Sequence, residues 1–281
     1  MLNHQYYAGS GSRTIQPYFV LSTASTYRKK IVADSPIAHF YSFVADCSAG
    51  EAFAVPDASV DVLFLCDPDE PKVRVCGSTV SAKLVELKTN KRYFGVRFRP
   101  GFIPAFIPLA SRDLIEAEVA LQDIDSQGQQ LLAQITAAPS FEDQVAYFMH
   151  HYGDRLARPQ SPLCAQISAL ILSRHGDIRV HELEAYTGYS SRYINKTFTE
   201  HFGLSPKQYC LIVRFQYTLQ KLTLAGPISL TNLALEQGYA DQSHFLREFK
   251  KFAALAPTKF VQALGQDQER YQGRILLSAY E

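Results

Sequence analysis

The chain has 281 residues, of which 47% are hydrophobic and 20% charged, and its formal net charge is +1. This balance excludes a disordered chain, a collagen-like fibre and a long coiled coil, and the length suits about two domains. No apolar run approaches the ~18 residues of a membrane span. The first residues also lack a basic segment followed by an apolar one, so we expect neither membrane insertion nor secretion. Five widely spaced cysteines without a CxxC pair favour reduced thiols and a cytoplasmic protein.

The chain up to about residue 109 is rich in strand-forming residues broken by Pro and Gly. Residues 60–66, 79–87 and 92–99 are predicted as strands. Several short strands that end in turn residues favour an antiparallel sandwich or barrel. The fold class predicted for the whole chain is therefore α+β, with strands first and helices afterwards.

A helical pattern begins at Ser111. Apolar residues at helical spacing, and two clearer segments over 129–137 and 141–152, predict helices across 111–152. Residues 153–162 are polar with two prolines and form the best linker. We therefore expect a first domain over 1–155, a second over 162–264 and a tail over 265–281. The sequence does not decide whether Ile275-Leu276-Leu277 docks the tail on the domain or on a partner.

The net charge is weak in both parts. Residues 1–161 hold 15 basic and 17 acidic residues, and residues 162–281 hold 13 and 10. A strongly basic coat is absent, so any DNA contact must come from a local patch.

The second part contains an internal repeat. Leu-Glu-Ala-Tyr-Thr-Gly-Tyr at 183–189 returns as Leu-Ala-Leu-Glu-Gln-Gly-Tyr at 233–239, and a helix and a Leu-x-Pro turn follow each copy. A short helix, a glycine turn and a second helix predict two helix-turn-helix units, over about 179–202 and 228–252. Residues 206–224 between them predict one helix, with Pro206 in its first turn and Gly226-Pro227 after its end.

The second helix of each unit has one apolar and one polar face. In the first, Arg192 and Lys196 point outward and Asn195 and Thr199 flank them. In the second, Ser243, Arg247, Lys250 and Lys251 point outward, His244 lies at the margin, and Gln242 lies nearer the buried side. Arg and Lys can donate to guanine, and Asn and Gln suit adenine, whereas Lys250 and Lys251 are better placed for phosphate. A single such helix is more often a solvated surface, but two matched copies favour DNA binding.

Residues 238–251, Gly-Tyr-Ala-Asp-Gln-Ser-His-Phe-Leu-Arg-Glu-Phe-Lys-Lys, closely resemble the signature of AraC/XylS-type transcriptional regulators, and so do residues 188–190, 202–206 and Arg214. The resemblance covers about residues 165–264. It implies an all-α domain that reads adjacent major grooves of promoter or operator DNA, with RNA polymerase as a partner. Gln242 is included on the resemblance alone. The helical faces and the resemblance together predict these DNA-binding residues: Ser190, Arg192, Asn195, Lys196, Gln242, Ser243, His244, Arg247, Lys250 and Lys251. Whether such a regulator activates or represses stays open.

The second unit departs from the family pattern. Ala253-Ala254 replace an aromatic residue and a glycine, and Ala256 replaces a serine. If the glycine position needs a positive φ, Ala254 is strained. The smaller Ala253 is expected to leave less core under the last helix.

The first half resembles, more loosely, the cupin-like β-barrel that some of these regulators use for sensing or dimerisation, through residues 56–64 and 95–101. This implies a small-molecule effector or a homodimer. Tyr93, Arg97 and Arg99 share one strand face and are the candidate ligand-binding residues, because an arginine inside a barrel can clamp an anion. The alternatives are a solvated face, or pairing with Asp57 or Asp61 that holds the barrel.

No metal, cofactor or catalytic site is predicted. His39 is the only histidine of the strand-rich region, and HExxH, GxSxG and P-loop motifs are absent. A ligand-responsive transcription regulator is therefore the leading hypothesis. The alternatives are a constitutive regulator whose first half is only an interaction module and, least supported, an enzyme.

Overall fold

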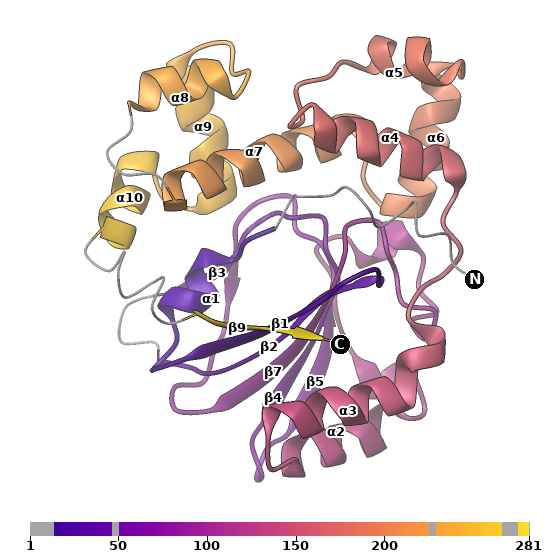
Figure 1. The fold of residues 1–281 in the computed structure, drawn as a ribbon, viewed down its shortest axis with the longest axis vertical. Coiled ribbons are helices and arrows are strands. Elements are labelled where there is room, and N and C mark those ends of the chain that lie inside the picture. Colours follow the sequence, from indigo (N-terminus) through magenta and orange to yellow (C-terminus); the bar gives the residue numbers. More distant parts are fainter. Residues whose placement is uncertain (1–13, 47–50, 225–228, 266–274, 281) are drawn as a thin grey trace.

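The computed structural model describes residues 14–46, 51–224, 229–265 and 275–280. A sheet with two helices beneath it forms one part, and a group of helices lies above the sheet (Figure 1). Gly226-Pro227, predicted to follow the end of the helix over 206–224, and Cys47, one of the five cysteines, lie outside these ranges. Among the described helices, none has both the length and the apolar character to cross a membrane.

Seven strands form the main sheet, in the order β8-β5-β4-β7-β2-β1-β9. Their bounds are Tyr27–Val32 (β1), Ile37–Val44 (β2), Asp61–Cys66 (β4), Lys72–Cys76 (β5), Arg92–Phe98 (β7), Glu118–Ala120 (β8) and Ile275–Tyr280 (β9). Two short strands, Ala52–Ala54 (β3) and Lys83–Val85 (β6), pair separately. The sheet is open, so the expected closed barrel is wrong. It is antiparallel except where β9 runs parallel to β1.

Alternating side chains of the sheet enter two different cores. Val62 and Phe64 of β4 pack toward helices α2 (Gly128–Ala137) and α3 (Phe141–Tyr152). Leu63 and Leu65 pack on the other side, together with the short helix α1 (Pro17–Leu21). A strand buried on both faces reads as a nearly continuous apolar run, which is why residues 60–66 were easy to predict.

The prediction of helices across 111–152 is confirmed only from residue 128 onward. Residues 111–127 form the 3-10 turns Ser111–Leu114 (η3) and Leu121–Asp123 (η4) with β8 between them. Glu116 has a φ of 61°, a left-handed conformation that interrupts a helix. The strand predicted over 79–87 is also shorter, because only Lys83–Val85 pair. The missed elements are the helix α1 and the strands β1, β2, β3, β5, β8 and β9.

The helical part begins after the turn Gly153–Arg155 (η5) and a short connection. Its helices are Pro162–Ser173 (α4), Val180–Thr187 (α5), Ser191–Phe202 (α6), Pro206–Leu224 (α7), Leu230–Glu236 (α8), Gln242–Ala253 (α9) and Pro257–Gly265 (α10). The bounds of α7 are those predicted from its apolar stripe.

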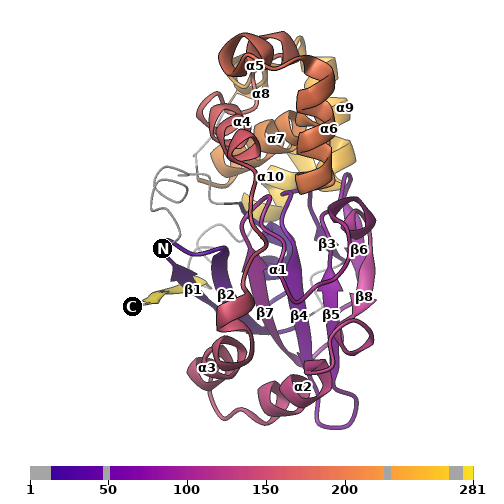
Figure 2. The same cartoon turned by 90° about the vertical axis from the view of Figure 1, so that its right-hand side faces the viewer.

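The connection between the two parts is held in place. The backbone N–H of Ala105 donates to the carbonyl of Arg155 at 3.0 Å, and that of Arg158 donates to Ile103 at 3.0 Å. Apolar cores also cross the boundary, because Tyr18 and Phe19 of α1 share one cluster with Phe215 of α7 and Phe249 of α9. The helical part is therefore packed against the sheet rather than tethered to it (Figure 2).

Candidate nucleic-acid interface

The first helix-turn-helix unit consists of α5, the turn at Gly188 and α6. Gly188 has a φ of 74°, and no atom lies within 4 Å of the position that a Cβ would take there. The turn therefore needs glycine for its backbone conformation and not for close packing. Ser190 caps α6 by accepting from the backbone N–H of Tyr193 at 3.4 Å. The Glu184 carboxylate of α5 accepts from the N–H of Ser191 at 2.5 Å, which fixes the angle between the two helices.

The faces of α6 are those predicted from its periodicity. Ile194, Phe198 and Phe202 are buried. Arg192 and Lys196 are exposed on the opposite side. Asn195 is half-buried, and its Nδ2 donates to the carbonyl of Ser191 at 2.8 Å. The outer face of α6 therefore exposes two cationic side chains, and the amide of Asn195 beside them already donates one hydrogen bond within the helix.

The second unit consists of α8, the turn at Gly238 and α9. Asp241 caps α9 by accepting from the N–H of His244 at 2.7 Å. Phe245, Phe249 and Phe252 are buried as predicted. The exposed residues of the outer face are Gln242, Ser243, Arg247, Lys250 and Lys251.

Two details of α9 differ from the sequence analysis. Gln242 is exposed, although its helical angle suggested the buried side, because it is the first residue of α9 and no preceding turn covers it. His244 is half-buried and is engaged by its neighbours. Its Nδ1 accepts from the N–H of Ala240 at 3.4 Å, and its Nε2 lies 3.6 Å from the Glu248 carboxylate.

A buried ion pair fixes α9 on α7. Arg214 of α7 makes a bidentate contact with Glu248 of α9, with an Nη2–Oε2 distance of 2.9 Å. Its Nη1 also donates to the carbonyl of Gly238 at 3.2 Å, and its guanidinium lies 4.3 Å from the ring centre of Tyr239. Arg214 therefore orients the turn and the recognition helix of the second unit together. The sequence signal was a charged residue inside the apolar stripe of a predicted helix.

Three exposed tyrosines surround the turn of the first unit, and the sequence analysis did not select them. Tyr186, Tyr189 and Tyr193 are 63%, 50% and 49% exposed, and the rings of Tyr189 and Tyr193 stack with centres 5.1 Å apart. Exposed tyrosine hydroxyls beside a recognition helix can donate to phosphate oxygens.

The helix α7 separates the two units, which lie at its opposite ends (Figure 1). It has 19 residues, and a helix of that length extends about 28 Å. Major grooves on one face of B-DNA recur about every 34 Å. The length of α7 is therefore within one helix diameter of the distance between two successive grooves.

The three candidate ligand-binding residues are not brought together at one site. Arg97 is 3% exposed and ion-paired: its Nη1 lies 3.0 Å from Asp57, and its Nη2 lies 2.6 Å from Asp61. Arg99 donates to the carbonyls of Ser35 and Val32 at 2.8 and 2.9 Å. The Tyr93 hydroxyl accepts from the N–H of Lys88 at 2.8 Å.

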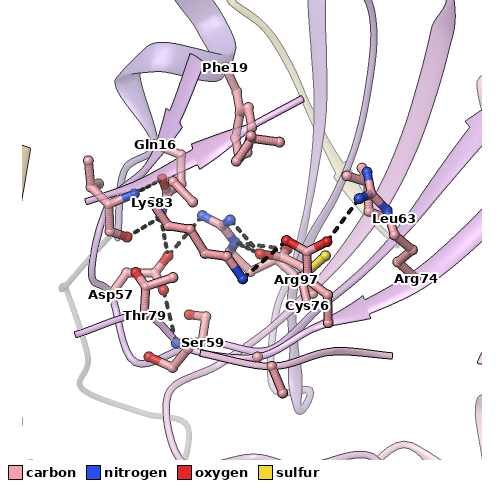
Figure 3. A pocket seen from close by; sticks show the side chains of 18 of the residues that line it. Gln16, Phe19, Asp57, Ser59, Leu63, Arg74, Cys76, Thr79, Lys83 and Arg97 are labelled. Carbon is pink, nitrogen blue, oxygen red and sulfur yellow. Dashed lines mark hydrogen bonds and ion pairs between the residues drawn. The ribbon is translucent and has the colours of Figure 1, made fainter. Parts of the chain in front are cut away.

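Arg97 lines a cavity between the main sheet and the β3–β6 pair (Figure 3). Burial alone would lower the pKa of Arg97, but the carboxylates of Asp61 and Asp57 raise it well above its usual value, so the guanidinium stays charged. Burial raises the pKa of the Cys76 thiol in the same wall to about 12, so this thiol stays protonated. Arg97 is therefore paired with Asp57 and Asp61, which was one of the alternatives in the sequence analysis, and these carboxylates balance its charge.

Comparisons with known proteins agree with this geometry. Residues 183–263 match the model of a helix-turn-helix domain family. Over 86 residues the chain is 29% identical to an uncharacterised HTH-type transcriptional regulator of Staphylococcus aureus strain N315. The matched segment covers 31% of this chain and 11% of that protein. An uncharacterised HTH-type regulator of Haemophilus influenzae is 27% identical over 92 residues, covering 33% of this chain and 30% of that protein. The chain thus spans about a tenth of the length of the Staphylococcus relatives it matches.

Two solved structures are also similar. One, described as a probable AraC family transcriptional regulator from Rhodopseudomonas palustris, is 31% identical, with a TM-score of 0.34, and the match covers 36% of this chain and 96% of that one. ToxT from Vibrio cholerae O395 is 14% identical, with a TM-score of 0.43, over 87% of this chain and 98% of that one.

The helical part is a tandem helix-turn-helix domain of the DNA-binding class. Through residues 183–263, this C-terminal domain belongs to the helix-turn-helix domain family that it matches.

Proposed function

We propose that the chain is a sequence-specific, DNA-binding transcription regulator. In this proposal α6 and α9 enter two successive major grooves, and the sheet domain adjusts their positions in response to a small molecule. The observation that carries the proposal is the pair of exposed cationic faces, with Arg192 and Lys196 on one helix and Arg247 on the other, at opposite ends of α7. Phosphate contacts from Lys250 and Lys251 would supply affinity without sequence preference.

Direct contacts between the two parts support ligand responsiveness over a purely passive first half. The N–H of Ala82, in the loop before β6, donates to the carbonyl of Lys251 in α9 at 3.1 Å. The Tyr18 hydroxyl of α1 donates to the carbonyl of Ala253, and Nε2 of Gln216 in α7 donates to the carbonyl of Pro56 at 2.7 Å. A ligand that shifts either loop would therefore shift a recognition helix by a short path.

The proposal takes RNA polymerase as the protein partner and the cytoplasm as the compartment, because a promoter-bound regulator acts where transcription starts. It also takes a homodimer as the form that binds paired operator sites. Light scattering of the purified chain, with and without DNA, tests this last part directly.

The test of DNA binding is a competition assay with the full-length chain. Selected duplexes should bind at least 10³-fold more tightly than bulk DNA, with an affinity that falls steeply as salt rises. Equal affinity for all duplexes would contradict sequence-specific recognition.

A further inference from the structure

Two tyrosine rings stack on the surface of the first helix-turn-helix unit, outside its apolar core. Tyr189 in the turn and Tyr193 in α6 are 50% and 49% exposed, and their ring centres lie 5.1 Å apart with 28° between the planes. In the described part of the chain, neither hydroxyl has a hydrogen-bond partner. Single exposed apolar side chains are normal, whereas adjoining ones favour an interaction surface.

Hydrogen bonds fix the backbone beneath these two rings, which we call the tyrosine pair. The backbone N–H of Tyr189 donates to Oγ1 of Thr187, and that of Tyr193 donates to Oγ of Ser190, both at 3.4 Å. The turn and the cap of α6 therefore hold both rings, although no core covers them. A side chain that is already held in place loses less conformational entropy when a partner binds.

The second unit uses the equivalent positions for its own packing. By the repeat, Tyr189 corresponds to Tyr239 and Tyr193 to His244. Tyr239 is 3% exposed, and the guanidinium of Arg214 lies over its ring. His244 is half-buried, and each of its ring nitrogens lies near a partner. The exposed tyrosine pair therefore belongs to the first unit alone, and the fold of such a unit does not require it.

Tyr193 lies at one edge of the outer face of α6. Successive residues of an α-helix turn by about 100°, so Tyr193 lies about 60° around the axis from Lys196, and Asn195 lies on the other side. The exposed cations Arg192 and Lys196 adjoin it, whereas the exposed Glu200 lies almost two turns further along the helix. The charge beside the tyrosine pair is therefore positive, which suits a partner that carries negative charge.

A helix in the major groove of DNA brings its two edges close to the walls of the groove. The groove is about 12 Å wide, and an α-helix with its side chains is about 10–12 Å across. The outermost side chains therefore meet the base edges, whereas side chains at an edge meet sugars and phosphates. A tyrosine there can pack its ring on a deoxyribose and donate its hydroxyl to a phosphate oxygen.

We propose that Tyr189 and Tyr193 bind the sugar–phosphate backbone of DNA beside the bases that α6 reads. The inference rests on the proposed function, and it adds a kind of contact that the lysines and arginines do not make. The contact is uncharged, independent of base sequence and confined to the first unit.

The test measures the affinity of full-length Tyr193→Phe and Tyr189→Phe for a selected duplex over a range of salt concentrations. Each substitution keeps the ring and removes an exposed hydroxyl, so the melting temperature should not change. We expect each variant to bind about fivefold more weakly, because one hydrogen bond to a phosphate is lost. The slope of log affinity against log salt should stay that of the wild type, because a tyrosine neutralises no phosphate charge.

Tyr147→Phe is the matched control. Tyr147 is 37% exposed, but it lies on α3, which is beneath the sheet, whereas α6 is above it (Figure 1). This variant should bind DNA as the wild type does. Lys250→Ala shows on the same duplex how the salt slope changes when a positive charge is lost.

The phosphate can be located by replacing single phosphates of the selected duplex with uncharged methylphosphonates. At the phosphate that accepts from Tyr193, the replacement should weaken binding of the wild type but cause little further loss in Tyr193→Phe. This phosphate should flank the box that depends on Arg192.

Wild-type affinity in both Tyr193→Phe and Tyr189→Phe would overturn the inference and leave the tyrosine pair as a surface for a protein. A loss that depends on one base pair, a changed salt slope or an equal loss in Tyr147→Phe would also overturn it. The proposed function fails if the wild type selects no duplex. The inference alone fails if the wild type selects duplexes and both variants bind them equally well.

Discussion

At the scale of single residues, we propose that the exposed side chains of α9 divide into base readers and phosphate contacts. Arg247 lies on the outer face nearer the N-terminus of α9, and Lys250 lies almost one turn further along. Arg247→Ala should cost about 1–3 kcal/mol at one favoured base pair and relax specificity there, because a bidentate guanine contact is lost. A loss of the same size on every DNA sequence would contradict this role.

The matched control is Lys250→Ala, measured on the same duplexes over a range of salt concentrations. A phosphate contact contributes to all sequences alike, so the variant should bind every duplex more weakly and reduce the salt slope by about one. Selectivity lost in Lys250→Ala and kept in Arg247→Ala would reverse the two assignments.

Ala254 has a strained backbone conformation, which the sequence analysis anticipated from the glycine that the family has at this position. Its φ is 60°, in the left-handed region, whereas Gly203 holds the corresponding position after α6 with a φ of 73°. Ala254→Gly should therefore raise the free energy of unfolding by about 0.5–1 kcal/mol, measured by urea denaturation. Ala253→Gly, one residue earlier inside the helix and buried, should lower it. Destabilisation by Ala254→Gly would show that this turn is not strained.

At the scale of elements, the ion pair between α7 and α9 sets the orientation of the second recognition helix. Arg214 and Glu248 are both about nine-tenths buried, so removing one partner leaves an uncompensated charge. Arg214→Met should destabilise the protein by about 3 kcal/mol, and adding Glu248→Gln should recover part of that loss. A double-mutant cycle in urea measures the coupling. Strict additivity of the two substitutions would contradict a direct interaction.

The strand β9 covers the edge of β1, and it is the element that the sequence analysis most clearly missed. It pairs in parallel with β1 over six residues, far from it in sequence. A variant ending at Gly265 should expose that edge and self-associate more strongly in sedimentation experiments, because an unpaired edge strand is a template for another chain. Unchanged self-association would show that β1 is protected by other means.

How well an element could be predicted depended on how local its determinants are. The helix α7 was predicted at its observed bounds because Pro206 and a regular apolar stripe specify it without help from the rest of the chain. Residues 111–121 carry a similar stripe, but Glu116 turns left-handed, and tertiary packing decides the conformation. Strand β9 depends wholly on a distant partner, so its short apolar run was ambiguous.

The same distinction applies to the candidate sites. The outward faces of α6 and α9 follow from helical period alone, and the structure exposes the residues expected there, with Gln242 added and His244 partly engaged. The cavity combines Ser59, Ser78 and Thr79 from loops whose proximity no local pattern encodes. The pairing of Arg97 with Asp57 and Asp61 could be stated only as an alternative, because strand registers were unknown.

At the scale of the whole molecule, the sheet and the DNA-binding domain share apolar cores and direct hydrogen bonds. The C-terminal ends of both recognition helices lie against the sheet part: Ala82 contacts Lys251 in α9, and Phe202 of α6 packs over Gly101. The N-terminal ends of α6 and α9 carry the exposed residues that we propose as base readers. This arrangement would let a change in the sheet domain alter the position of both units, while the outer faces of α6 and α9 stay accessible.

The most direct test of the central claim, that two units read two grooves, is selection of duplexes from a random library with the full-length chain. We predict one motif with two boxes about one helical turn apart. Arg192→Ala should blur only one box, and Arg247→Ala only the other. A single box, or the same box lost in both variants, would contradict tandem recognition.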